Sequence, residues 1–215
     1  IVFADGSTAR RESVSAGQIS KLEAAGRLFT DRIGQAVSSS GSPFVIVGYD
    51  RRFLSDLFAQ RAAEVLAGNY FHVWIFNEAA PTPLISWAVK DLKAAGGIVI
   101  TASHNPADFN GFKIKAPWGG SAAPETTAAV EKLVDATPPK RADVPTETHK
   151  LLEPAIESYR TQIGSYIDLD RLRKSAGNVV VDPMHGAGGT WVESFLDGGT
   201  LKDWAQEKKH TWEEV

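Results

Sequence analysis

Short apolar runs alternate with helical patterns along much of this chain, and this alternation limits its fold more strongly than any other feature. Runs rich in β-branched and aromatic residues occur at 44–48, 70–76 and 98–101. Between them, apolar residues recur every three or four positions at 53–67 and again from Pro83, which is the period of an amphipathic helix. The pattern predicts an α/β fold: a mainly parallel mixed sheet with helices on both faces, an α/β/α sandwich.

Further segments extend this order on both sides of the alternating region. Helices are predicted at 13–37 and 126–134. The Pro-rich, charged stretch 136–150 is typical of a linker. A helix at 155–166 follows, and then an apolar strand, a Gly-rich turn and a helix start within 178–196. Because one such βα unit cannot bury its own apolar face, we expect an incomplete second α/β unit.

Charge and composition exclude several classes of protein. The 215 residues include 23 Lys and Arg against 26 Asp and Glu, and the formal net charge of -3 does not supply the basic field that nucleic-acid binding requires. There is no cysteine, so disulfides and thiolate metal sites are impossible. No apolar run reaches the roughly 20 residues that span a bilayer, and the signal-peptide pattern is missing. We expect a soluble, cytoplasmic protein without nucleic-acid or membrane partners; its oligomeric state stays unknown.

Polar segments follow all three apolar runs. They read GYDRR at 48–52, NEAAPTP at 77–83 and TASHNP at 101–106. In parallel α/β sheets, ligands bind beyond the carboxyl ends of the strands, so we expect these segments to meet at one rim. The Ser-His pair in the last segment has two interpretations that spacing alone leaves open. Ser103 and His104 either satisfy local backbone groups or form a nucleophile with its proton acceptor.

Four motifs resemble those of one enzyme superfamily. TASHNPADFNGFKIK, residues 101–115, resembles the active-site segment of the phosphohexomutases, the phosphoglucomutases and phosphomannomutases. VGYDRRFLS at 47–55 is similar to the family's G-x-D-x-R strand end, PTPL at 81–84 to its Pro-Thr-Pro turn, and VVVDPMHGAGG at 179–189 to the opening of its second domain. Because all four occur in the family's order and spacing, the chain is identified as a member of this superfamily.

The resemblance implies a division of the chain into parts. Residues 1–135 correspond to domain I of the family, 136–150 to a linker, and 151–200 to the start of an incomplete domain II, while 201–215 form an unassigned polar tail. The family's D-G-D-x-D-R metal loop, its Gly-Glu-x-Ser sugar-recognition loop and its Arg-Ser-Gly-Thr phosphate segment are missing from this sequence. We therefore expect a fragment, a sequence with internal residues left out, or a truncated gene product.

The resemblance also implies that Ser103 is a phosphoserine. It would give its phosphoryl group to the sugar and take one back after the bisphosphate reorients, with His104 and Lys113 beside it in proton-transfer and charge-stabilising roles. Mg²⁺ would bind the phosphoserine oxygen, which makes Ser103 the one metal ligand expected in this chain, and hexose 1,6-bisphosphate would be activator and intermediate. A lone serine holds Mg²⁺ poorly, because hard cations need several oxygen ligands.

Four arginine and asparagine residues are candidates for binding phosphate or supporting the loop. Asn105 and Arg52 match motif positions that support it, although Arg52 and Asp50 are also interpretable as a surface ion pair worth about 0–1 kcal/mol. Arg10 and Arg11, in IVFADGSTARRES, correspond loosely to the family's N-terminal arginine that reaches the catalytic phosphate.

The resemblance predicts the phosphoserine-bearing part of a phosphoglucomutase or phosphomannomutase, an intramolecular phosphotransferase that interconverts hexose 1-phosphate and hexose 6-phosphate in carbohydrate metabolism. We expect the chain alone to have little or no mutase turnover. Trp118 is most simply interpreted as a packing residue, although it is expected to lie close enough to the serine segment to touch a ligand. One alternative is a non-catalytic, truncated mutase domain that binds sugar phosphate or a protein partner. Another is a hydrolase that uses Ser103 and His104, although no acidic residue follows in a recognisable triad.

Overall fold

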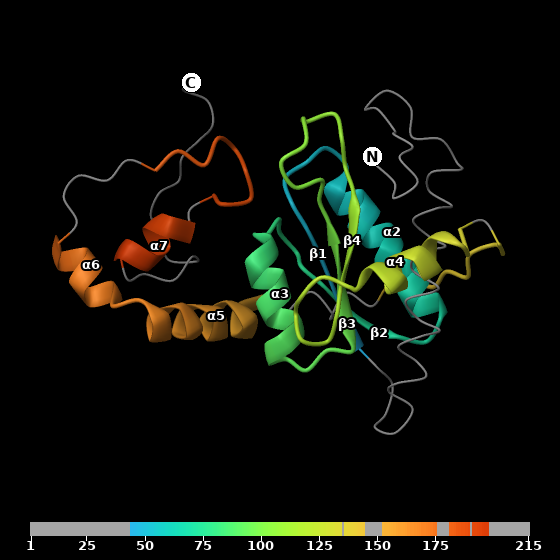
Figure 1. Cartoon of the computed structure of the whole chain (residues 1–215), viewed down its shortest axis with the longest axis horizontal. Helices are drawn as coiled ribbons and strands as arrows, with labels where there is room; N and C mark the ends of the chain where they lie inside the picture. The colour runs from blue at the N-terminus through green and yellow to red at the C-terminus, as the bar shows by residue number, and fades with distance from the viewer. Residues whose placement is uncertain (1–43, 135, 145–151, 176–180, 190, 198–215) are drawn as a thin grey trace.

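The computed structural model describes residues 44–134, 136–144, 152–175, 181–189 and 191–197 (Figure 1). Outside these residues lie the helix expected at 13–37, the candidate residues Arg10 and Arg11, and the tail 201–215. The expectations for these segments stay predictions.

The described strands are β1 (Phe44–Tyr49), β2 (His72–Ile75), β3 (Gly96–Ile100) and β4 (Phe112–Lys115). They form one sheet in the order β2-β1-β3-β4 (Figure 1). β1 pairs in parallel with both β2 and β3, whereas β4 runs antiparallel to β3. The predicted mainly parallel mixed sheet is confirmed, and its three parallel strands end at one edge, where β4 begins.

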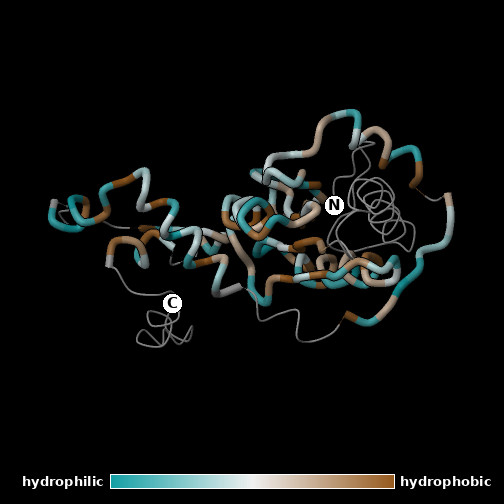
Figure 2. Tube along the Cα trace, turned by 90° about the horizontal axis from the view of Figure 1, so that it is seen from below, coloured by the Kyte–Doolittle hydropathy of each residue, from teal (hydrophilic) through white to brown (hydrophobic). Residues whose placement is uncertain are grey.

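Helices cover both faces of the sheet, as the alternation predicts. Those on the first face are α2 (Ser55–Gly68) and α4 (Pro124–Glu131), and those on the second face are α3 (Thr82–Asp91) and α5 (Leu152–Tyr166). Successive residues of β1 enter the two cores in turn: Val45 and Val47 on the first face, Ile46 on the second. Along the helices the tube in Figure 2 alternates between apolar and hydrophilic residues, as expected for elements with one buried side.

The structure corrects three details of the sequence-based expectation. β2 spans only His72–Ile75, because Tyr70 adopts a left-handed conformation (φ 67°) in the turn that follows α2. A short helix, α6 (Leu169–Ser175), was not predicted. Trp118 follows β4, whose last residue Lys115 pairs with Gly97 near the start of β3. The expectation that Trp118 lies close to the serine segment is wrong, because antiparallel β4 carries the chain to the opposite edge of the sheet. Trp118 is also 66% exposed, so it is not a core packing residue.

The first half of the stretch interpreted as a linker packs along α2. The Ala142 amide donates to the carbonyl oxygen of Glu64 (3.1 Å), and Val144 packs against the core of the first face. Gly68 has no room for a side chain, since a Cβ there would lie 2.6 Å from the carbonyl oxygen of Lys140. This segment therefore follows the helix rather than lying free in solvent.

The last described elements are α5, α6 and α7 (Trp191–Asp197). Trp87 of α3 donates a hydrogen bond to Ser158 of α5 (3.0 Å), and Arg160 and Arg173 donate to the last carbonyl groups of α7. Of the strand expected before α7, residues 178–180 lie outside the described part, so the second α/β unit and its boundaries stay predictions. No helix in the described ranges combines the length and apolarity needed to cross a bilayer.

Candidate active site

The three polar segments that follow β1, β2 and β3 meet at the carboxyl edge of the sheet. The Asp50 amide donates to the carbonyl oxygen of Ile100 at the end of β3 (3.1 Å). On the other side of β1, the Ala80 amide donates to the carbonyl oxygen of Tyr49 (2.9 Å). The expectation of one shared rim is confirmed, and it follows from the parallel pairing of these strands.

Ser103 lies on the loop of residues 101–111, called the Ser103 loop below, which joins β3 to β4. Its backbone is left-handed (φ 57°), and its amide donates to Thr101 Oγ1 (3.0 Å). The Thr101 amide donates to the carbonyl oxygen of Gly111 (2.9 Å), which closes the loop at its base. The Ser103 side chain is exposed, and its Oγ lies 3.4 Å from Nδ1 of His104. The structure therefore presents a hydroxyl and an imidazole together at the rim.

Arg52 binds the backbone of the Ser103 loop through its guanidinium group. Nη1 donates to the carbonyl oxygens of residues 106 and 109 (2.7 and 2.9 Å), and Nη2 to those of residues 103 and 105 (2.9 and 2.6 Å). Nε lies 3.3 Å from Oδ2 of Asp50. The two terminal nitrogens of the guanidinium thus make four hydrogen bonds to the loop, and its third nitrogen contacts the Asp50 carboxylate. The geometry supports a loop-supporting role for Arg52, and it differs from the isolated surface ion pair considered as an alternative.

Two buried polar residues of the site were not singled out from the sequence. Asn110 is 4% exposed and Ser55 is fully buried. Asn110 Nδ2 donates to Ser55 Oγ (2.8 Å) and to the carbonyl oxygen of Phe53 (3.3 Å). The signal was present in the Asn-Gly pair of the loop and in the serine that follows GYDRR, but neither residue type indicates burial by itself.

Lys113 lies on β4, opposite Val99 of β3. Within the described part of the chain it forms no hydrogen bond or ion pair with the Ser103 loop. Lys115, two residues further, points to the same face of the sheet. Burial lowers the pKa of Lys115 from its ordinary value, and the positive charge of Lys113 lowers it further. The two lysines thus make this part of β4 electropositive.

Arg51 and Asn105 extend the site outward. The Asn105 side chain is exposed, and only its backbone carbonyl reaches Arg52. Arg51 is exposed as well, and its Nη2 lies 3.8 Å from the point that a Cβ on Gly189 would occupy. The Gly-rich turn before α7 therefore approaches the rim at Arg51, a residue that the sequence did not mark as a candidate.

The oxygen atoms near Ser103 do not form a divalent-cation site by themselves. Four carbonyl oxygens of the loop already accept bonds from Arg52. Among the residues that the structure describes, no group of three or more His, Asp and Glu side chains could hold a metal. Mg²⁺ prefers octahedral oxygen coordination, so the Ser103 hydroxyl alone does not fit it.

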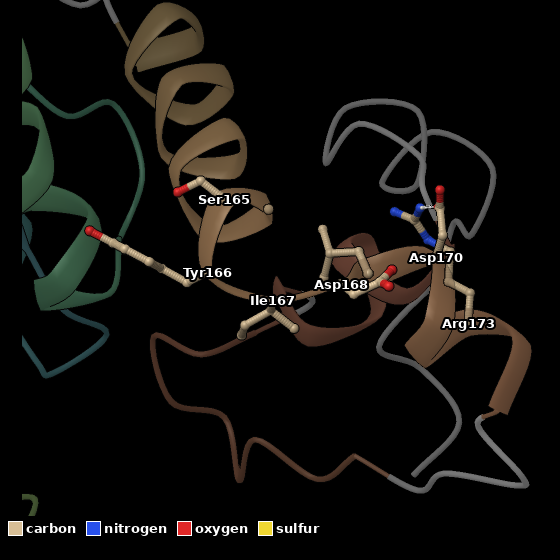
Figure 3. Close-up of a pocket in the computed structure, with 8 residues that line it drawn as sticks. Ser165, Tyr166, Ile167, Asp168, Asp170 and Arg173 are labelled. Atoms are coloured by element: carbon tan, nitrogen blue, oxygen red, sulfur yellow. Dashed lines mark hydrogen bonds and ion pairs between the residues drawn. The ribbon is translucent and has the colours of Figure 1, made fainter.

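A hollow of about 520 Å³ lies elsewhere, where α5 meets α6 (Figure 3). It is lined by Tyr166, Ile167 and Asp168, among others. Figure 3 shows Arg173 beside Asp170, with which it forms an ion pair of 2.8 Å. The hollow contains none of the residues predicted for the active site.

Comparisons with known proteins agree with this geometry. The sequence profile of the family described as phosphoglucomutase/phosphomannomutase, alpha/beta/alpha domain I, matches residues 10–141. A Schizosaccharomyces pombe protein described as "Probable phosphoribomutase" is 32% identical over 181 residues, which cover 78% of this chain and 30% of that protein. A phosphoglucomutase of Staphylococcus aureus is 30% identical over 164 residues, which cover 74% of this chain and 30% of the relative. The chain thus spans 30% of the length of these curated relatives.

Solved structures show the same fold. A Thermus thermophilus protein assigned as a phosphomannomutase superposes with a TM-score of 0.72 at 35% identity, over 89% of this chain and 41% of that one. The Paramecium phosphoglucomutase pp63/parafusin superposes with a TM-score of 0.68 over 89% of this chain and 40% of its own, and at 18% identity it shows the fold alone. With its family profile, its relatives and the Ser103 loop in agreement, the chain belongs to the phosphoglucomutase/phosphomannomutase family.

Proposed function

We propose that this chain carries the phosphoserine of a hexose phosphomutase and that Ser103 is the residue that becomes phosphorylated. One observation supports the proposal most. The Ser103 hydroxyl is exposed at the carboxyl edge of parallel strands, while the loop beneath it is fixed through Arg52. A fixed, accessible hydroxyl with an imidazole beside it is what phosphoryl transfer to serine requires. The relatives are named as mutases of three different sugar phosphates, and among these classes we propose a hexose phosphate.

In the proposed half-reaction, Ser103 Oγ attacks a phosphorus atom of hexose 1,6-bisphosphate. The Oγ–P bond forms, the bond from phosphorus to the sugar oxygen breaks, and that oxygen takes up the proton that the serine hydroxyl loses. His104 is the proposed carrier of this proton; its Nδ1 lies 3.4 Å from Oγ, and we expect the contact to shorten in the complex with substrate. In the proposed reverse half-reaction, the phosphoserine gives its phosphoryl group to the free 6-hydroxyl of hexose 1-phosphate. The resulting bisphosphate reorients and returns its 1-phosphoryl group to Ser103, which leaves hexose 6-phosphate.

Lys113 is the proposed electrostatic partner of the transferred group. A phosphoryl group in transfer carries negative charge on its three outer oxygens, which a nearby ammonium group stabilises. β4 begins at the rim with Phe112, so Lys113 lies one residue from that edge. Mg²⁺ stays a proposed cofactor that would add further charge neutralisation. The phosphoserine oxygen of Ser103 would be one of its ligands, and the remaining ligands are absent from this chain.

We propose that the 215-residue chain carries out this half-reaction without sustained interconversion, because it spans 30% of the length of the curated relatives. The proposal includes a place in carbohydrate metabolism and a cytoplasmic address. A coupled assay of the isolated chain that showed full conversion of glucose 1-phosphate would contradict the proposed lack of sustained interconversion.

A pulse-chase experiment tests the transfer itself. The chain is incubated with phosphate-labelled glucose 1,6-bisphosphate and Mg²⁺, separated from the sugar, and chased with unlabelled glucose 1-phosphate. We expect label on the wild type and on Ser121→Ala, an exposed serine in the turn after β4, but none on Ser103→Ala. The chase should move the label to the sugar.

The other outcomes each contradict the proposal in a different way. Release of the label as free phosphate in buffer would identify a hydrolase. Saturable glucose 1-phosphate binding without any label on a folded chain would identify a non-catalytic binding domain.

A further inference from the structure

We propose that Asp50, Ser55 and Asn110 form one hydrogen-bond network, buried at Ser55 and Asn110, that positions Ser103 by fixing both halves of its loop. The network is read from the structure alone, and only its consequence for phosphoryl transfer rests on the proposed function. None of the three side chains bonds to Ser103, so they are positioning residues that act through Arg52 and Gly111.

The inventory of donors and acceptors fixes the direction of each bond. An ionised Asp50 only accepts, so the Ser55 hydroxyl donates its one proton to Asp50 Oδ1 (2.9 Å). Ser55 Oγ is then left to accept from Asn110 Nδ2 (2.8 Å). With its nitrogen placed in this way, Asn110 turns its Oδ1 toward the amide of Gly111, which donates to it (2.9 Å). Asp50 thereby determines the orientation of the backbone at the end of the loop.

The same carboxylate fixes the residue that binds the middle of the loop. Asp50 Oδ1 accepts from the backbone amide of Arg52 (2.9 Å), and Oδ2 lies 3.3 Å from Arg52 Nε. These contacts leave Nη1 and Nη2 directed at the four loop carbonyl groups. One carboxylate therefore contacts Arg52 directly and reaches Asn110 through Ser55.

Polar bonds contribute most of the contacts that the structure shows for the middle of this loop. Residues 103–108 are all exposed, so apolar burial in the loop is concentrated at its ends, where Ala102 is 5% exposed. Ser103 also keeps a positive φ of 57°, which costs free energy for a residue other than glycine and persists only where the surroundings impose it. At the base of the loop, Gly111 has no space for a Cβ, which would lie 2.7 Å from the carbonyl oxygen of Thr101.

A network of this kind makes a specific prediction about two residues that share no hydrogen bond. Arg52 and Asn110 hold different parts of the loop, and Asp50 and Ser55 connect their side chains. Two backbone links add to this connection, one through the carbonyl group of residue 109 and one through that of Phe53. Their substitutions should therefore be non-additive, and removal of the Ser55 hydroxyl should weaken that coupling, because only the backbone links would remain.

Amide hydrogen exchange of the intact chain, followed by mass spectrometry, measures this coupling without any substrate. We expect Arg52→Lys and Asn110→Ala each to lower the protection of the loop amides about tenfold, and the double variant about tenfold to twentyfold rather than about a hundredfold. In a Ser55→Ala background the effect of the double variant should come closer to the product of the two single effects. Peptides from β1 and β3 report whether each variant is folded.

Two variants serve as matched controls. Ser158→Ala removes a side-chain hydrogen bond between α3 and α5, and Asn69→Ala removes one at the end of α2. Both should leave the protection of residues 101–111 unchanged. Three results would each overturn the proposal. The Arg52→Lys and Asn110→Ala effects on amide protection could multiply without the Ser55→Ala change, the control variants could lower the protection of the loop equally, or the loop amides of the wild type could show no protection. If Asn110→Ala fails to fold, the Arg52→Lys and Ser55→Ala pair carries the same test.

A second readout separates positioning from stability. With glucose 1,6-bisphosphate as the phosphoryl donor, Ser55→Ala should lower the rate of Ser103 phosphorylation about tenfold at saturation and leave the half-saturating concentration unchanged. A change in the half-saturating concentration alone would contradict a positioning role. Absence of phosphate from every variant, including the wild type, would count against the proposed function. The non-additivity of Arg52→Lys and Asn110→Ala in amide hydrogen exchange would still show whether the network exists.

Discussion

The Ser103 loop and the 183–189 turn each contain an exposed histidine and at least one residue with positive φ, yet the hydrogen bonds described for them differ. In the loop, Arg52 reaches carbonyl groups 51 to 57 positions further along the chain. In the turn, the Gly186 amide donates to Pro183 and the Gly189 amide to Gly186, three residues apart. The loop is thus tied to the strand-to-helix connection after β1, whereas these bonds of the turn are local.

This difference shows how an exposed hydroxyl can be held in one place. Local bonds define the shape of a turn, but they leave its position relative to the sheet to other contacts. Arg52, which follows β1, binds the Ser103 loop directly. Asn110 of the loop binds Ser55 at the start of α2, so the loop is held against both elements. Phosphoryl transfer depends on such positioning, because a misplacement of about 1 Å reduces the rate about a hundredfold.

Removal of the Arg52 side chain should give the largest effect, because it removes the bonds from Arg52 to four carbonyl groups of the loop. We expect Arg52→Ala to lower the free energy of unfolding by about 2–4 kcal/mol and the rate of Ser103 phosphorylation about a hundredfold or more. Urea denaturation and phosphate incorporation measure the two quantities. Arg61→Ala breaks only an i,i+3 ion pair with Glu64 and should change stability by less than about 0.5 kcal/mol. Similar losses in both variants would remove the distinction.

Matched glycine substitutions compare the two segments directly. Gly111→Ala should destabilise the chain by about 1–3 kcal/mol, because its Cβ would lie 2.7 Å from a backbone oxygen that cannot move away. In the turn, the nearest atom to a Cβ on Gly188 is 3.9 Å away, so Gly188→Ala should change stability by less than about 0.5 kcal/mol. Thermal unfolding of both variants provides the measurement. The reverse order would show that the turn is the more constrained segment.

The two histidines test chemistry rather than stability. We expect His104→Ala to reduce the rate of Ser103 phosphorylation about tenfold to a hundredfold, since its Nδ1 is next to the reacting oxygen. His185→Ala, in the 183–189 turn, should leave that rate unchanged. Rate constants at saturating bisphosphate give the comparison. Equal rates for His104→Ala and the wild type would exclude His104 from proton transfer.

The smallest effect is expected at Lys115, beyond the loop on β4. Burial and the charge of Lys113 lower its pKa in the folded chain from 10.5, so the folded state holds this proton less tightly than the unfolded state. The free energy of unfolding should therefore rise as the pH increases from the lowered pKa of Lys115 to 10.5. Lys115→Met should be more stable than the wild type at about pH 7, with a smaller difference at about pH 10. Urea denaturation at both pH values checks this, and a constant difference would contradict it.

The periodicity of the sequence predicted the elements that place the site. Apolar runs at 44–48 and 98–101 became parallel strands, and that pairing alone brings Asp50 and Thr101 to the same rim. The resemblance added the identity of Ser103 as the residue of interest. These features depend on local pattern and on one topological rule, so they can be read without coordinates.

Other features depend on where distant backbone atoms lie. The four carbonyl partners of Arg52 and the burial of Asn110 exist only after β1, α2 and β4 have packed, and no residue type encodes them. The placement of Trp118 was wrong for a related reason: closeness in sequence to the serine segment did not account for the reversal of β4. The docking of the segment before residue 145 on α2 is likewise a result of tertiary packing.

Site-resolved mass spectrometry after incubation with glucose 1,6-bisphosphate tests the central claim most directly. The claim is that the long-range bonds of the Ser103 loop hold Ser103 as a phosphoryl acceptor. We predict phosphate on Ser103 of the wild type, and about a hundredfold less at the same time in folded Arg52→Ala. Phosphate on a different residue, no phosphate on the folded wild type, or equal phosphorylation of both proteins would contradict it.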